Sequence, residues 1–307
     1  MTWTPAALPS QSGKTFVVTG GNAGLGYFTA EQLAGAGAHV VLASRNRQRA
    51  ETAARSIRGQ VPGASIDLIE LDLASLDSVR RAGAELAAFD RLDGLILNAG
   101  LTAGGNTREV TADGDELMFG TNFLGHFALT ALAWPALLRH PESRVVGLGS
   151  IATWLVPLDP DDLQSERRFE FFRAYGFSKH AVQGFILELD RRIRAAGLSV
   201  AATLAHPGYA IDGLSPFRPG VSEPSTAARI GNALALGSQG KNRGAANTVR
   251  AAIDPEVVGG EFVGPQYLTR GRPELARPVA SSASPEFGQH LWKLAEDWSG
   301  VTFAVRS

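Results

Sequence analysis

A tyrosine and a lysine stand four residues apart, Tyr175 and Lys179, where a long apolar periodicity from Phe177 to Ile193 begins. On a helix, positions i and i+4 share a face, so the phenol and the ammonium would lean into the same space. A free phenol has a pKa of about 10, and a neighbouring cation lowers that pKa toward the range where the group exchanges protons with a substrate. Because this spacing also occurs in ordinary helices, its meaning depends on the rest of the chain.

The composition limits the class of protein. The 307 residues are 44% hydrophobic, which is enough for the core of one large domain or two small ones. The formal net charge of -1 gives no indication of binding to nucleic acid or anionic lipid. The absence of cysteine excludes disulfides and thiol nucleophiles, and the six histidines show no metal-ligand spacing, so no metal is expected. With no signal-peptide pattern and no run of membrane-spanning length, we expect a cytoplasmic protein without a membrane span.

Patterns of buried strands alternate with helical patterns along the chain. Strand-like apolar runs occupy residues 14–19, 39–43, 66–71, 95–97, 144–148, 198–204 and 260–264. Helical patterns occupy residues 26–36, 47–58, 75–89, 113–139, 175–194, 224–236 and 287–298, with Gly300 placed to end the last. This order predicts the α/β class, with a Rossmann-type doubly wound parallel sheet of about seven strands and helices on both faces.

No linker divides the chain. Residues 1–13 are expected to form an N-terminal lead-in, and residues 14–307 a single domain for dinucleotide binding and catalysis. Pro, Gly and Ser concentrate in the predicted loops at about 208–224 and 264–285. The first follows the carboxyl end of a strand, where ligands bind in open α/β sheets, so it is a candidate lid. Residues from about 265 to 307 form a C-terminal extension.

Glycines separate the first strand from the first helix in the sequence Thr-Gly-Gly-Asn-Ala-Gly-Leu-Gly of residues 19–26. They allow a tight turn and the close approach of a diphosphate, whose charge the helix N-terminus attracts. Many turns contain glycines, but the position between a buried strand and a helix predicts a dinucleotide site. The expected contacts are Gly20, Asn22, Gly24, Leu25 and Gly26.

The end of the second strand indicates which dinucleotide binds. NAD sites usually have an acidic residue there for the ribose 2′-hydroxyl, whereas this chain has Ser44, Arg45 and Asn46. Arg45 can form a charge-assisted pair with a 2′-phosphate, and Ser44 can add a hydroxyl. Alternatively, Arg45 is a solvated residue and Asn46 only caps the next helix. The pattern favours NADP(H) over NAD(H).

In their order and placement, these motifs resemble those of the short-chain dehydrogenase/reductase family over nearly the whole chain. The glycine turn is similar to the family's cofactor turn, and Tyr175-x-x-x-Lys179 to its catalytic pair. Asp72-Leu73 is similar to the family's pair that contacts the adenine, and Asn98-Ala99-Gly100 is similar to its signature after the fourth strand. Asn122 and Ser150 match the remaining catalytic positions of the family. Pro207-Gly208 is similar to its turn beside the nicotinamide.

The resemblance implies a role for each catalytic residue. Tyr175 would exchange a proton with the substrate oxygen during hydride transfer, and Ser150 would hold that oxygen by a hydrogen bond. Lys179 would lower the tyrosine pKa and bind the nicotinamide ribose, while Asn122 would anchor a water that leads protons toward Lys179. Taken singly, Ser150 could be a strand-end cap, and Asn122 and Asn98 could bond only to backbone.

Within the family, the chain is most similar to retinol-dehydrogenase-like and protochlorophyllide-reductase-like members. The likeness includes Ala43-Ser-Arg-Asn46, His206-Pro-Gly-Tyr209 and an acidic insertion at residues 159–163, between the serine and the tyrosine. One departure is Asp212, where the family commonly has a threonine that touches the nicotinamide amide. The resemblance also implies a homodimer or homotetramer.

We therefore expect an NADP(H)-dependent oxidoreductase for a small-molecule carbonyl or alcohol, with an apolar substrate. Trp154, Leu155, Tyr209 and Phe217 either line its pocket or pack within the lid, and His126 and His206 are expected to be structural. The main alternative is a non-catalytic NADP(H)-binding sensor or scaffold, which has no need of the complete Ser, Tyr, Lys and Asn set. A sugar-nucleotide epimerase fits less well because the C-terminal part is short.

Overall fold

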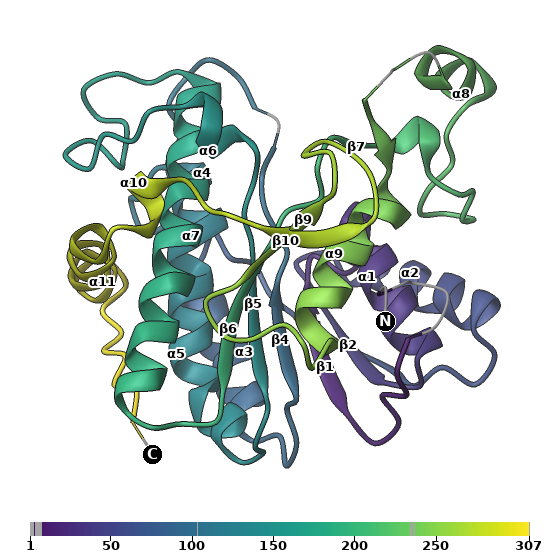
Figure 1. Cartoon of the computed structure of the whole chain (residues 1–307), viewed down its shortest axis with the longest axis horizontal. Coiled ribbons are helices and arrows are strands. Elements are labelled where there is room, and N and C mark those ends of the chain that lie inside the picture. The colour runs from purple at the N-terminus through teal and green to yellow at the C-terminus, as the bar shows by residue number, and fades with distance from the viewer. Residues whose placement is uncertain (1–2, 4–7, 103, 234, 236, 307) are drawn as a thin grey trace.

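The computed structural model describes residues 3, 8–102, 104–233, 235 and 237–306, so parts of the predicted lead-in and the end of the predicted helix 224–236 lie outside the described residues. Its centre is one eight-stranded sheet in the order β10-β9-β6-β5-β4-β1-β2-β3 (Figure 1). The strands are β1 Thr15–Thr19, β2 His39–Ser44, β3 Ile66–Glu70, β4 Gly94–Leu97, β5 Arg144–Leu148, β6 Ala201–Ala205, β9 Phe262–Pro265 and β10 Pro273–Ala276.

The predicted doubly wound sheet is confirmed, with one addition. Neighbouring strands from β3 to β9 pair in parallel, whereas β10 pairs antiparallel with β9. The eighth strand lies inside the segment 264–285 that we predicted to be a loop. Its sequence Pro-Glu-Leu-Ala lacks the β-branched run that marks the buried strands, because an edge strand is covered on fewer sides.

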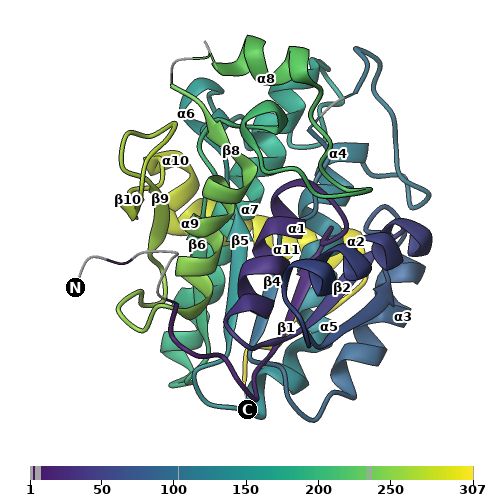
Figure 2. The same cartoon turned by 90° about the vertical axis from the view of Figure 1, so that its right-hand side faces the viewer.

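Two helical layers cover the sheet (Figures 1 and 2). One face carries α1 Gly24–Gly35, α2 Arg47–Gln60 and α9 Lys241–Ile253, and the other carries α3 Leu76–Ala87, α5 Gly125–Leu138 and α7 Phe171–Ala195. Outside α7 lie α10 Ala280–Ala283 and α11 Pro285–Ser299, which ends at Gly300 in a left-handed conformation, as predicted. The shorter helices are α4 Leu117–Phe119, α6 Ala152–Leu155 and α8 Thr226–Ala233.

The core has two parts because each central strand is buried on both faces. In β1, Val17 packs toward α3, α5 and α7, while Phe16 and Val18 pack toward α1 and α9. This two-sided burial explains the continuous apolar strands of the sequence. Along the described part of the chain, no helix combines the length and apolar character needed to cross a membrane.

Helix α9 was missed by the sequence analysis. It packs on α1 through small residues. A Cβ added at Gly244 would lie 3.0 Å from Leu25 Cδ2 and 3.0 Å from the carbonyl oxygen of Pro207. Small side chains allow this close approach, and the buried face of α9 consists mainly of Gly and Ala with few large apolar residues to mark it in the sequence.

Candidate active site

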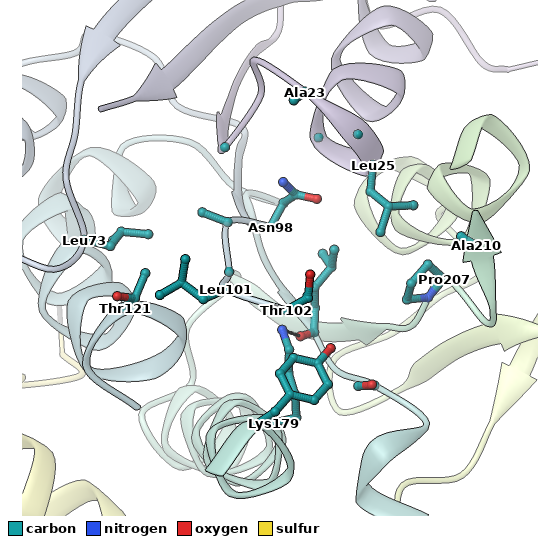
Figure 3. A pocket seen from close by; sticks show the side chains of 18 of the residues that line it. Ala23, Leu25, Leu73, Asn98, Leu101, Thr102, Thr121, Lys179, Pro207 and Ala210 are labelled. Carbon is teal, nitrogen blue, oxygen red and sulfur yellow. Dashed lines mark hydrogen bonds between the residues drawn. The ribbon is translucent and has the colours of Figure 1, made fainter. Parts of the chain in front are cut away.

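One large cavity lies at the carboxyl ends of the parallel strands. Between β1 and β4 the strand order reverses, which is where open α/β sheets form a ligand crevice. The cavity has a volume of about 820 Å³, and segments that follow β1 to β6 line it. Figure 3 shows Lys179 on one side of this space and Ala23 and Leu25 at the start of α1 on the opposite side, with Leu73 and Pro207 toward its two ends.

Nearly all predicted site residues meet in this cavity. Its lining includes Gly20, Asn22, Gly24, Leu25, Gly26, Ser44, Arg45, Asn46, Asp72, Leu73, Asn98, Ala99, Gly100, Ser150, Tyr175, Lys179, Pro207 and Gly208. Asn122 is the one predicted residue that does not line it. Residues from widely separated parts of the sequence therefore share one space.

The glycine turn brings the start of α1 close to the loop after β4. Gly20 and Gly24 adopt positive φ angles of 65° and 55°, and a Cβ on Gly26 would lie 2.4 Å from both Asn98 Nδ2 and the carbonyl oxygen of Gly20. Thr19 Oγ1 accepts hydrogen bonds from the backbone N–H groups of Asn98 at 3.0 Å and Ala99 at 2.9 Å. These contacts hold the two loops together.

The N-terminus of α1 suits an anionic group. Its N-cap, Ala23, has no side chain that can cap the helix, so the first N–H groups receive no side-chain acceptor. Gly24 faces the cavity, where its missing side chain leaves space. The turn therefore fits the diphosphate of a dinucleotide, by backbone N–H groups and the helix dipole.

We expect Gly26→Ala to lower the free energy of unfolding by about 1–3 kcal/mol, because the new methyl group would overlap Asn98 Nδ2 and a backbone oxygen. Gly59→Ala is the matched control, since Gly59 lies in α2 with no atom within 4 Å of its Cβ position. That variant should gain up to about 1 kcal/mol from helix propensity. Urea unfolding of both variants measures the difference, and equal stabilities would contradict the predicted overlap.

The segment after β2 and the first turn of α2 each place an arginine in the cavity lining. Arg45 and Arg49 both line the cavity and are exposed, and among the described residues neither side chain has a hydrogen bond or ion pair. Asn46 Oδ1 accepts from the Arg49 backbone N–H at 2.9 Å, so Asn46 caps α2 and also lines the cavity. Arg49 was missed by the sequence analysis, although its position one turn beyond Asn46 on the same helix could have identified it.

The tyrosine and the lysine lie on one face of α7, which begins at Phe171 rather than at Tyr175. Lys179 Nζ lies 5.8 Å from the centre of the Tyr175 ring and donates a 2.9 Å hydrogen bond to the carbonyl oxygen of Leu148. Burial lowers the pKa of Lys179 to about 8. The phenol and the ammonium are thus neighbours, as the spacing predicted, but the ammonium donates its hydrogen bond to the last residue of β5.

The pKa of Tyr175 is shifted in the direction opposite to our expectation. Burial raises the pKa of Tyr175, and a hydrogen bond with the Ser150 side chain offsets part of that rise. The sequence spacing gave no information on burial, which is the largest influence on the pKa of Tyr175 in this structure. The Ser150 side chain lies next to the tyrosine hydroxyl, two residues after the end of β5.

Asn122 lies behind the cavity in a π-helical turn, Gly120–Leu124. Its Oδ1 accepts from the Leu101 N–H at 2.7 Å, and its Nδ2 donates to the Leu101 carbonyl at 3.2 Å and to Ser178 Oγ at 2.9 Å. A Cβ on Gly100 would lie 3.1 Å from Asn122 Oδ1 and 3.6 Å from Lys179 Nζ, so Gly100 separates the two groups. The Asn122 side chain thereby fixes the loop that follows β4.

Both histidines near the site are buried, and burial lowers the pKa of each to about 4. His126 bridges the Asn122 carbonyl oxygen at 2.8 Å and Thr19 Oγ1 at 2.9 Å. His206 Nδ1 accepts from the Gly208 N–H at 3.3 Å, and its ring packs edge-on against Trp154. These contacts agree with the structural roles expected for both.

The end of the cavity near Tyr175 is apolar. Leu155 and Tyr209 line it, as one of our two alternatives predicted, whereas Trp154 and Phe217 do not. Phe171 and Phe172, one helical turn before Tyr175, also line it and were missed because that segment was not predicted to be helical. Apolar and aromatic side chains therefore form part of the cavity lining together with Tyr175.

Comparison with known proteins adds independent findings. The family model for short chain dehydrogenases matches residues 14–211. The chain is 40% identical to human retinol dehydrogenase 13 over 212 residues, which are 67% of this chain and 63% of that protein. It is 36% identical to mouse polyprenol dehydrogenase over 293 residues, covering 94% of this chain and 84% of that protein.

Solved structures resemble the whole fold. A crystal structure of an uncharacterised protein from Mycobacterium paratuberculosis has 35% sequence identity and a TM-score of 0.81, covering 99% of this chain and 100% of that one. A short chain dehydrogenase from Burkholderia cenocepacia in complex with NADP has 25% identity and a TM-score of 0.61, covering 82% of this chain and 96% of that one.

Proposed function

The chain belongs to the short-chain dehydrogenase family, and from that premise we propose that it is an NADP(H)-dependent oxidoreductase that acts on an apolar carbonyl or alcohol. The observation that supports this most is the single cavity at the end of β1 to β6. It contains a dinucleotide-type glycine turn, two arginines without a partner among the described residues, and the Ser150, Tyr175 and Lys179 side chains. A binding protein without turnover would not need the last three together.

Each catalytic side chain has a proposed task. The nicotinamide, when bound, supplies or accepts the hydride. Ser150 holds the substrate oxygen by a hydrogen bond, and Tyr175 gives a proton to that oxygen or takes one from it. With a pKa of about 8, Lys179 changes its protonation near neutral pH and is proposed to replenish the tyrosine proton while it binds the nicotinamide ribose.

The proposed role of Asn122 is narrower than the resemblance implies. Its side-chain amide is already occupied by Leu101 and Ser178, so it positions the loop that carries Asn98 and Gly100. A water that leads protons toward Lys179 would bind a remaining lone pair of Asn122 Oδ1, which accepts from Leu101, or of the Asn122 backbone oxygen, which contacts His126. We keep the water relay as a prediction.

The proposed cofactor contacts run along the cavity from one end to the other. The adenosine 2′-phosphate is assigned to Ser44, Arg45 and Arg49, and the adenine to Asp72 and Leu73. The diphosphate is assigned to Asn22 and the glycines of the turn. The nicotinamide nucleoside is assigned to Asn98, Lys179, Pro207 and Gly208. Unpaired guanidinium groups suit a 2′-phosphate, because they bind phosphate through parallel charge-assisted hydrogen bonds. The NADP complex of the Burkholderia cenocepacia relative supports this preference.

We expect Arg45→Ala to weaken NADPH binding by about tenfold or more and to leave NADH binding unchanged, because only NADPH has the 2′-phosphate. Arg47→Ala is the matched control, since Arg47 stands two positions away, pairs with Glu51 at 3.1 Å and does not line the cavity. Fluorescence titration of both cofactors measures the four affinities. An Arg45→Ala variant that binds NADPH as the wild type does would exclude this role for Arg45.

The proposed substrate is apolar near its reacting carbon. Leu155, Phe171, Phe172 and Tyr209 add apolar and aromatic surface to the lining of the cavity that holds Tyr175. The relatives named retinol and polyprenol dehydrogenases support a substrate with an extended hydrocarbon chain. The location of the protein in the cytoplasm and its assembly as a homodimer or homotetramer stay predictions.

Purified protein with NADPH and a panel of aldehydes, ketones and quinones of increasing chain length tests the proposal, with NADPH absorbance as the readout. Oxidation that becomes faster with chain length supports the enzyme and its apolar pocket. Tight NADPH binding without turnover on any carbonyl would favour the alternative, a non-catalytic NADP(H)-binding sensor or scaffold.

A further inference from the structure

A lysine outside the predicted site lies over the glycine turn. Lys241 is the first residue of α9, and its side chain lines the same cavity and is 24% exposed. Its Nζ lies 3.5 Å from the position that a Cβ would take on Gly24, at the start of α1. The ammonium therefore faces the part of the cavity where the α1 N-terminus is free of side-chain caps.

The ammonium is held there by the proposed lid. Lys241 Nζ lies 2.7 Å from Asp212 Oδ2, the residue that replaces the family's threonine. The two backbones are also joined, because β7 (Ala210–Ile211) pairs in parallel with β8 (Gln239–Gly240) and the Lys241 N–H donates to Ser215 Oγ at 2.9 Å. Figure 1 shows β7 beside the start of α9.

The distribution of charge gives Lys241 a distinct place. The charged residues that line the cavity are Arg45, Arg49, Asp72, Lys179 and Lys241. Arg45 follows β2, Arg49 lies in the first turn of α2, and Lys179 lies beside Tyr175. Lys241 is therefore the full positive charge at the glycine turn among the described lining residues. A diphosphate placed on this turn would otherwise meet only backbone N–H groups and the partial charge of a helix dipole.

We propose that Lys241 is a further cofactor-binding residue, whose ammonium binds the diphosphate of the dinucleotide while Asp212 competes for it from the lid. An ammonium has three N–H donors, so it can keep one hydrogen bond to Asp212 and give another to a phosphate oxygen. The pair is partly exposed, with Asp212 at 66% exposure, so it adds little to stability by itself. This inference rests on the proposed dinucleotide function.

Calorimetric titration with ADP-ribose 2′-phosphate, which has the diphosphate, and adenosine 2′-monophosphate, which lacks it, tests the assignment. We expect Lys241→Met to weaken binding of the first ligand by about 10- to 100-fold and to leave the second unchanged. Asp212→Asn should tighten binding of the first ligand by about two- to fivefold, because the competing carboxylate is gone. Lys241→Arg should restore most of the affinity, since a guanidinium also binds phosphate.

Two controls distinguish loss of the Lys241 contact from a general effect of the substitution on binding or folding. Lys293→Met, at an exposed position of α11, should bind both ligands as the wild type does, and thermal melts confirm that each variant is folded. Wild-type affinity for ADP-ribose 2′-phosphate in Lys241→Met would overturn the inference, and weakened binding in Asp212→Asn would overturn the competition. If the wild type binds neither NADPH nor these fragments, the proposed function itself fails.

Discussion

Tyr175→Phe should lower kcat by about three orders of magnitude and leave the affinity for NADPH nearly unchanged. The variant keeps the partly buried ring on α7, at the wall of the cavity, and removes only the hydroxyl that interacts with Ser150. General acid or base catalysis by a positioned side chain contributes about 10²- to 10⁴-fold. Because burial raises the pKa of Tyr175, the tyrosine is protonated at neutral pH and is ready to donate to a carbonyl oxygen.

Steady-state assays in the direction of carbonyl reduction, combined with fluorescence titration of NADPH, measure the two effects separately. Tyr267→Phe makes the same chemical change at an exposed position that does not line the cavity, and it should behave as the wild type does. If Tyr175→Phe kept more than about a tenth of the wild-type kcat, a proton donor other than this tyrosine would be required.

Much of the site could be predicted because its motifs directly follow buried strands. The glycine turn follows β1, Asn98 follows β4 and Ser150 follows β5, and the carboxyl ends of parallel strands meet at one edge of the sheet. The strand pattern therefore determined where these side chains converge, although they are far apart in the sequence.

The remaining parts depend on contacts that have no local sequence pattern. Helix α9 packs closely on α1 through small residues, so few large apolar side chains mark its buried face in the sequence. The Lys241 ammonium is held at the site by a hydrogen bond to Asp212, which is 29 positions earlier in the chain and belongs to a different element. The direction of the Tyr175 pKa shift depends on burial, which residue spacing does not reveal.

Lys179 links the stability of the protein to its proposed chemistry. Burial lowers its pKa from 10.5 to about 8, so between these two values the unfolded chain binds more protons than the folded protein. The free energy of unfolding should therefore rise with pH across that window. Below pH 8 the lysine is charged in both states, and its burial costs the folded protein about 3 kcal/mol.

Lys179→Met should consequently lower kcat by about 100-fold or more and raise the free energy of unfolding at pH 7 by about 2 kcal/mol. The gain is smaller than the full cost of burying the charge, because the hydrogen bond to the Leu148 carbonyl is also lost. Urea unfolding of the cofactor-free protein at pH 7 and pH 10 tests this, with Lys293→Met as the exposed control. The wild type should gain stability between these pH values relative to the variant.

A Lys179→Met variant that is less stable than the wild type at pH 7, or that shows the same pH dependence, would mean that the charged form of this lysine is stabilised by its surroundings. In that case its ammonium would be the permanent form at neutral pH, and the proposed exchange of protons with Tyr175 would have to be abandoned.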